Sequence, residues 1–324
     1  YNFELLALYN NSWGNFDFNA TLGGNLYKVN NQTIVTTAKD MKIRDVVALM
    51  SFNEVSVEPY SYRKQINSIY GAVNLGWKHM LYFDATLRGD QSSTLPISNN
   101  MYIYPSFSGS FVFSELLKLG DKLPYGKVRM SWAQVGSDTD PYQLGLVYTK
   151  SKFAYPGYTI GYISNGTIPN KDLKPTKTNS FEMGLELKFL KNRIGLDFTY
   201  YSQLSKNQIM GMASSSTSGY GYRLINAGEI ENKGVEIALN TRPIQTKDFS
   251  WDLNFNFSKN SNKVKKLVDD MDMFELEKAT WLDVQVAAKV GENFGSIVGP
   301  DFQRNENGDI LIDPSTGLPM YDKS

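Results

Sequence analysis

Two acidic side chains at regular spacing are the first residues of this sequence that could carry chemistry. Glu182 and Glu186 lie four residues apart in a stretch where apolar and polar residues alternate. Paired carboxylates can hydrolyse glycosidic bonds when they lie about 5–9.5 Å apart. On an extended strand, four residues span about 13 Å. The spacing therefore favours hydrated charges on the polar face of a wall over a catalytic pair.

The single histidine, His79, is the second candidate for catalysis. A hydrolase would hold such a histidine beside a serine or carboxylate partner, in mid-wall or on the outer side. His79 instead falls in a short link between two predicted strands, so we interpret it as a turn residue. The chain has no cysteine, which argues against disulfides, redox chemistry and Cys- or His-rich metal sites.

A third candidate is the segment Asn305-Glu306-Asn307-Gly308-Asp309, which resembles part of a calcium-binding loop. The EF-hand pattern requires Asp where this chain has Gln303 and Glu where it has Pro314. A hairpin turn at Asn307-Gly308, followed by a strand from Ile310 to Ile312, fits the residues better. The sequence thus predicts no catalytic, cofactor-binding or metal-binding residues.

Tyrosines in two long links are candidates for ligand contact. They could stack on sugar rings or bind a partner protein, and they could equally be packing that orders a long link. Both interpretations stay open from the sequence. The residues concerned are Tyr155, Tyr158, Tyr162, Tyr220 and Tyr222.

The elements that must position these residues are strands, because two-residue alternation recurs along the chain. From Phe249 to Ser258, for example, aromatic and aliphatic residues occupy every odd position and polar residues every even one. The pattern predicts about ten antiparallel strands. Their approximate ranges are 1–8, 15–23, 66–77, 80–88, 104–113, 127–135, 180–189, 193–202, 229–241 and 249–258.

The links between these strands alternate between short and long. Long links are predicted at about 24–65, 89–103, 136–178 and 203–228, and residues 37–50 could form a short helix within the first. Transmembrane barrels have short turns on the periplasmic side and long loops outside. Aromatic residues make up 13% of the chain although its mean hydropathy is only −0.35, which suits a wall with one apolar face. The pattern therefore predicts a membrane β-barrel with long extracellular loops.

Soluble β-sandwiches and solenoids also have alternating strands, and they are the structural alternative. Large aromatic residues near the strand ends, such as Trp77, Phe113 and Trp251, favour the barrel because they would form an interfacial girdle. The opposite face carries charge in mid-strand. We interpret it as facing the lumen, with candidate residues Asp84, Arg88, Glu182, Glu186, Asp197 and Asp252. The balanced charge, 33 basic against 33 acidic residues, gives no indication of a nucleic-acid partner.

Several segments, in order, resemble the SusC/RagA-type TonB-dependent transporters of Bacteroidota. They include LYFDATLRGDQSSTLP (81–96), NNMYIYPSFSGSFVFSE (99–115), KVRMSWAQVGSDTDPYQL (127–144), PNKDLKPTKTNSFEMGLELKFLKNRIGLDFTYY (169–201) and NAGEIENKGVEIALN (226–240). The resemblance implies an outer-membrane barrel of 22 strands, of which this chain would supply about ten without the plug domain or the final strands.

The resemblance also implies a function and partners. Such a protein imports oligosaccharides or other oligomers such as peptides, together with a SusD-like surface lipoprotein. It receives energy from TonB through an N-terminal region that this chain lacks, and it contacts the lipid bilayer. Two alternatives remain from the sequence: an adhesin or structural barrel without transport, and an outer-membrane enzyme that uses His79.

Overall fold

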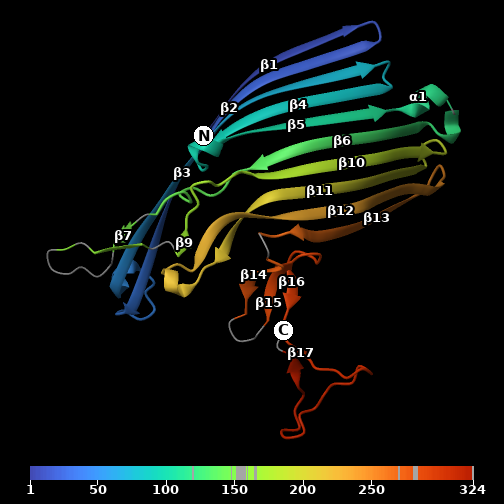
Figure 1. Cartoon of the computed structure of the whole chain (residues 1–324). Helices are drawn as coiled ribbons and strands as arrows, with labels where there is room; N and C mark the ends of the chain where they lie inside the picture. Colours follow the sequence, from blue (N-terminus) through green and yellow to red (C-terminus); the bar gives the residue numbers. More distant parts are fainter. Residues whose placement is uncertain are drawn as a thin grey trace.

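A computed structural model describes residues 1–324 except 119, 147, 151–157, 159, 164–165, 269–270, 280–283 and 323–324. Long antiparallel strands follow one another side by side in chain order and form one curved sheet (Figure 1). They are β1 (Asn2–Trp13), β2 (Phe16–Met41), β3 (Phe52–Trp77), β4 (Leu81–Ser92), β5 (Met101–Phe111), β6 (Tyr125–Ser137), β10 (Thr176–Phe189), β11 (Ile194–Ala213), β12 (Tyr222–Gln245) and β13 (Ser250–Lys266). The prediction of an all-β antiparallel fold is confirmed.

Several predicted links are wrong because the strands on either side continue into them. Residues 28–41 of β2 stay paired with residues 52–65 of β3, so much of the predicted 24–65 link is a long two-stranded arm. The possible helix at 37–50 is wrong too, because β2 runs to Met41 and only Leu49–Ser51 is helical, as a 3-10 turn. Phe113 does not extend β5, since it starts the short helix α1 (Phe113–Leu117).

One face of the sheet is apolar across every long strand. Direct register partners lie side by side on the same face, so a row can be followed from β1 to β13. One such row contains only apolar residues. In order it comprises Trp13, Phe16, Trp77, Leu81, Phe111, Val128, Leu185, Phe198, Ile237 and Phe257.

This row crosses the apolar face diagonally. It starts at Trp13, the last residue of β1, and reaches Phe257, beyond which the same face of β13 continues with Lys259. The apolar residues of β1 therefore lie on one side of the row, and those of β13 on the other. A stagger of this kind is what tilted strands produce when a sheet curves into a barrel wall.

The opposite face carries a polar row. Its members are Asn10, Asn19, Asn74, Asp84, Ser108, Ser131, Glu182, Tyr201, Gly234 and Asn260, each directly paired with the next. On every strand the members of the two rows lie three residues apart, an odd spacing that places them on opposite faces because successive side chains alternate. The sheet is therefore a thin wall with a different chemistry on each side.

Within the described residues, the apolar face is not sealed under a second layer. Phe249, Trp251, Leu253 and Phe255 are 58%, 47%, 41% and 58% exposed. A packed sandwich would bury such side chains in its core. These exposures therefore argue against the sandwich alternative and agree with a wall that meets another apolar medium. No helix among the described residues is long and apolar enough to cross a membrane.

A small hydrophobic core lies at the far end of β13. Val264 and Leu267 pack there with Phe274 and Ala288, which belong to a three-stranded sheet of β14 (Met273–Lys278), β15 (Gln285–Lys289) and β16 (Ser296–Val298). Figure 1 shows this small sheet beside the edge of the main one. Further short strands are β7 (Tyr148–Lys150), β8 (Gly161–Ile163), β9 (Thr167–Ile168), β17 (Asp301–Phe302) and β18 (Tyr321–Asp322).

The predicted turn at Asn307-Gly308 is confirmed, but the strand predicted from Ile310 to Ile312 is wrong, since Ile310 and Ile312 form only isolated bridges, with Arg304 and Pro319. Gly308 has a φ of +88°, and the Asn305 N–H donates to the Asp309 carbonyl at 2.9 Å. The side-chain oxygen of Asn305 accepts from the N–H groups of Asn307 and Asp309, both at 2.9 Å. That oxygen therefore accepts hydrogen bonds from the backbone of the turn itself. Among the described residues, no group of three or more His, Cys, Asp or Glu side chains is placed to hold a metal ion.

Candidate functional site: the polar face of the wall

The structure places all six predicted lumen-facing residues on the polar face. Asp84 and Glu182 belong to the polar row itself, and each of the others lies four or eight residues from a member of the row on the same strand, an even spacing that keeps it on the same face. Glu182 and Glu186 are not brought together, since each pairs with a different position on β6, Ser131 and Lys127 respectively. The six residues are thus spread over the face and form no single cluster.

One of them, Asp197, is held by an arginine that crosses a whole strand. Arg129 on β6 donates two hydrogen bonds to the Asp197 carboxylate on β11, at 3.0 and 3.1 Å, and another to the Thr199 hydroxyl at 2.6 Å. The strand between them is β10, where Gly184 lies directly beside Arg129. A Cβ at Gly184 would lie 2.6 Å from Arg129 Cζ. The glycine therefore provides the space in which the arginine lies flat.

Two tyrosines repeat this arrangement on the same face. Tyr70 on β3 lies over Gly23 on β2 and donates to the Glu4 carboxylate on β1. Tyr201 on β11 lies over Gly234 on β12 and donates to Asn260 Oδ1 on β13 at 3.1 Å. We call these three-strand arrangements the glycine-seated braces. They hold long polar side chains along the wall, so these side chains do not project from it.

Arg88 belongs to a further network near the long-link end of β4. Its Nε donates to Asp90 Oδ1 at 2.8 Å, and its NH2 group donates to the Ser68 hydroxyl at 2.9 Å. The Tyr104 hydroxyl donates to the other Asp90 oxygen. Asp90 is buried. The hydrogen bonds from Arg88 and Tyr104 compensate for the burial of its charge. Sequence reasoning missed Asp90, although its spacing of two from Arg88 predicted the same face.

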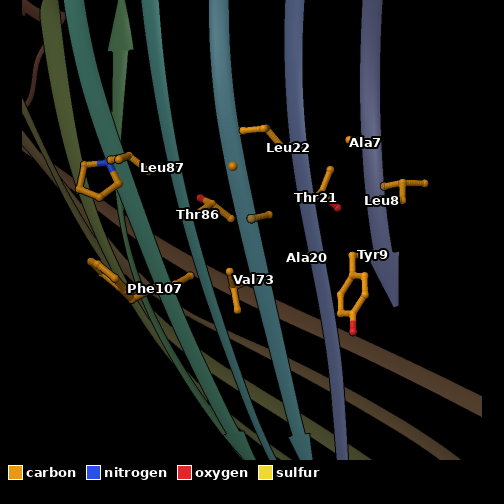
Figure 2. Close-up of a pocket in the computed structure, with 14 residues that line it drawn as sticks. Ala7, Leu8, Tyr9, Ala20, Thr21, Leu22, Val73, Thr86, Leu87 and Phe107 are labelled. Carbon is orange, nitrogen blue, oxygen red and sulfur yellow. The ribbon is translucent and has the colours of Figure 1, made fainter. Parts of the chain in front are cut away.

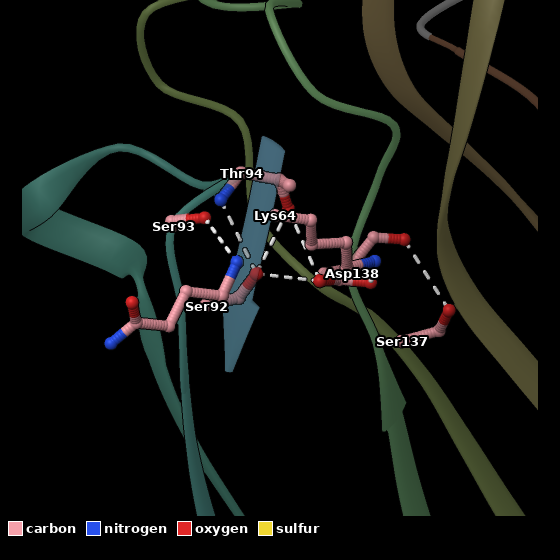
Figure 3. Close-up of polar contacts among 7 residues, drawn as sticks. Lys64, Ser92, Ser93, Thr94, Ser137 and Asp138 are labelled. Atoms are coloured by element: carbon pink, nitrogen blue, oxygen red, sulfur yellow. Dashed lines mark hydrogen bonds and ion pairs between the residues drawn. The ribbon is translucent and has the colours of Figure 1, made fainter. Parts of the chain in front are cut away.

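Asp138, at the end of β6, is the hub of a polar cluster that the sequence did not indicate. It accepts from Lys64 Nζ at 2.7 Å, from the Ser92 hydroxyl at 2.5 Å and from the Thr94 hydroxyl at 3.1 Å (Figure 3). Ser92 and Thr94 are buried. The cluster ties the start of the β6–β10 link to the base of the arm on β3 and to the link after β4, so these three segments are held together.

A hollow of about 610 Å³ lies on the apolar side of the wall, away from these charges. Small residues at Ala7, Ala20, Gly71 and Ala85 line it, and larger ones such as Phe107 stand at its margin (Figure 2). None of the residues that line it is charged. The hollow therefore belongs to the apolar face and not to the polar site.

The aromatic candidates are not brought together in the described part of the chain. Tyr155 and the side chain of Tyr162 lie outside it. Tyr158 and Tyr222 are exposed and Tyr220 is half-buried, and no described hydrogen bond or ring contact joins these three. The prediction that they contact a ligand or partner thus stays a prediction.

His79 occupies a tight turn between β3 and β4. Lys78 and His79 have φ values of 49° and 54°, and the Met80 N–H donates to the Trp77 carbonyl at 2.9 Å. The imidazole is 84% exposed, with its Nδ1 4.0 Å from Asp17 Oδ2. This geometry agrees with the turn-residue interpretation.

Comparison with known proteins identifies the architecture. Residues 1–293 match the family described as TonB dependent receptor-like, beta-barrel. The TonB-dependent receptor P3 of Formosa agariphila is 28% identical over 314 residues, which are 93% of this chain and 31% of that protein. The TonB-dependent receptor SusC of Bacteroides thetaiotaomicron is 30% identical over 225 residues, 66% of this chain and 22% of that protein. The chain thus spans at most about a third of these curated relatives.

Solved structures show the same fold. The structure of the RagAB peptide transporter superposes with a TM-score of 0.83 at 20% identity, covering 99% of this chain and 35% of that one. The siderophore receptor PirA from Acinetobacter baumannii superposes less well, with a TM-score of 0.51 at 16% identity, over 92% of this chain and 46% of that one.

Proposed function

Because the chain belongs to the TonB-dependent receptor β-barrel family, and so to an outer-membrane barrel, we propose that it forms part of the wall of a nutrient importer. The observation that carries the proposal is the pair of register rows, one wholly apolar and one polar, that cross the same strands. In lipid every backbone amide needs a partner, and a closed sheet provides it. A polar inner face then leaves a hydrated path for cargo.

We further propose that the cargo is an oligomer, either an oligosaccharide or a peptide. The relatives supporting this are SusC and the RagAB complex, which is described as a peptide transporter. A SusD-like surface lipoprotein would cover the outer mouth, and TonB would act through a region other than these residues. The long links would then face the outside, where loops of such barrels lie.

In this proposal the residues of this chain line the path and contribute no bond chemistry. The glycine-seated braces hold Tyr70, Arg129 and Tyr201 along the wall, which keeps the space beside them open. The Asp138 hub fixes the outer links against one another. The catalytic alternative that used His79 has no support from its exposed place in a turn.

The experiment is growth of a strain that lacks the gene, on a panel of glycans and peptides, each supplied as the sole oligomer. We expect growth to be lost on one oligomer and retained on its monomers, because small solutes enter by other channels. The full-length gene should restore growth. Unchanged growth on every oligomer, together with reduced surface attachment, would instead support the adhesin or structural barrel.

A further inference from the structure

The apolar face of the last strands ends in a row of lysines. Lys259 follows Phe257 on the same face of β13, and Lys233 follows Val235 on the same face of β12, both toward the long links. Lys263 continues the β13 series. On β10 and β11, Lys177 and Lys206 are direct register partners beyond Phe181 and Tyr200. We call these five residues the lysine rim.

Three members of the rim lie close together. Lys259 pairs directly with Val235 and Lys263 with Glu231, so both are diagonal neighbours of Lys233. Diagonal positions on adjacent strands lie about 7–8 Å apart. The flexible stem of lysine spans such a gap easily. The three ammonium groups can therefore converge on one anion of phosphate size.

The charge of the rim is only partly neutralised by the protein. Lys206 Nζ lies 3.2 Å from Glu229, and Lys233 Nζ lies 3.4 Å from Glu231. Lys265, next to the rim, also lies within 3.7 Å of Glu231. Among the described residues, no acidic group lies within ion-pair distance of Lys177, Lys259 or Lys263. These three cations are left available to a partner outside the chain.

At the opposite end of the same strands, the basic residues lie in the turns and on the polar face, and the apolar face carries none in the corresponding row. There the corresponding row of the apolar face is Phe189, Ile194, Thr241 and Leu253. The lysines are therefore a feature of one boundary of the apolar band, the one at the long links. A lysine at such a boundary keeps its stem on the apolar surface and its ammonium group among the lipid headgroups.

We propose that the lysine rim binds the phosphate groups of glycolipid headgroups in the outer leaflet of the membrane. Phosphate oxygens are strong acceptors that lysine binds as a point charge. The site is continuous with the lipid-facing surface, so a bound headgroup would sit directly above its own acyl chains. The inference rests on the membrane position of the wall and on the long links facing outward. It does not depend on which cargo is imported.

The test uses the full-length protein in detergent with rough lipopolysaccharide as the probe. We expect the combined variant Lys177→Gln, Lys259→Gln and Lys263→Gln to bind the lipopolysaccharide at least about tenfold more weakly. The reason is that each basic residue near a charged lipid surface contributes to the free energy of binding. These three substitutions leave no carboxylate unpaired, because none of the three lysines has an acidic partner in the described structure. Binding by the native protein should also weaken as salt increases.

The matched control removes the same charge from the short-turn end, through Lys78→Gln, Lys122→Gln and Lys247→Gln, all of which are exposed. We expect this variant to bind as the native protein does. An equal loss in both variants, or no loss in the rim variant, would overturn the proposal. Should the rim variant fail to fold, native protein is compared on phosphorylated and dephosphorylated lipid A. Equal affinity for the two would overturn the proposal as well.

Discussion

Replacing Met130 with arginine should destabilise the folded wall in a lipid bilayer by about 2–4 kcal/mol, as for a charge on the lipid face near the midplane of a barrel. Met130 lies on the apolar face of β6, between Gly109 of β5 and Met183 of β10, and its side chain is exposed there. The measurement is the free energy of unfolding of full-length protein in lipid vesicles, obtained from denaturant titration.

The neighbouring residue provides the control for this substitution. Ser131 lies on the polar face, directly beside Glu182. An arginine at Ser131 would remain in water opposite a carboxylate, so we expect a change of less than about 1 kcal/mol. If Met130→Arg and Ser131→Arg had the same cost, the two faces would not meet different media, and the assignment of a lipid-facing side would be wrong.

After Met130→Arg, we expect the largest loss of stability from Gly184→Leu, which should lower the free energy of unfolding by about 1–3 kcal/mol. The added side chain would occupy the space of the Arg129 guanidinium and so break its two hydrogen bonds to Asp197. The ion pair is more than a third exposed, so solvent screening reduces its own contribution. Most of the expected cost is therefore steric.

A double-mutant cycle separates this explanation from a backbone requirement. In an Arg129→Ala background the space beside Gly184 is empty, so Gly184→Leu should cost less than about 0.5 kcal/mol, with a coupling energy of about 1 kcal/mol or more. Gly195→Leu is the matched control, because the nearest atom to a Cβ there, the Asn240 carbonyl oxygen, is 3.9 Å away. If Gly184→Leu lost the same free energy of unfolding in the Arg129→Ala background, the explanation by the glycine-seated brace would be wrong.

The parts of the fold that sequence could predict are those that depend on neighbouring residues. Alternation at 249–258 shows directly which side chains share a face, because the strand period is two. The arm formed by residues 28–41 and 52–65 escaped prediction because Asn30, Asn31 and Gln32 interrupt the alternation. Only main-chain pairing with β3 keeps this segment extended, and that pairing joins residues far apart in the chain.

The sequence was enough to predict that this face is polar, but not which of its side chains contact one another. Asp197 was identified from its place on the polar face, while its partner Arg129 lies 68 residues away and two strands across the sheet. Finding this contact requires the register of β6, β10 and β11 together. Gly184 carried the one local signal, since a glycine inside a strand often marks close approach by another group.

The central claim is that alternate residues of this wall face hydrocarbon and water. This chain contains no cysteine, so a single cysteine for a spin label can be introduced at each position from 252 to 257, in full-length protein from which any cysteine outside these residues has been removed and which is reconstituted in lipid. We expect labels at Leu253, Phe255 and Phe257 to be relaxed mainly by oxygen, which partitions into lipid. Labels at Asp252, Asn254 and Asn256 should be relaxed mainly by a water-soluble nickel complex. Uniform accessibility along this stretch, or odd positions shielded from both reagents, would contradict the account.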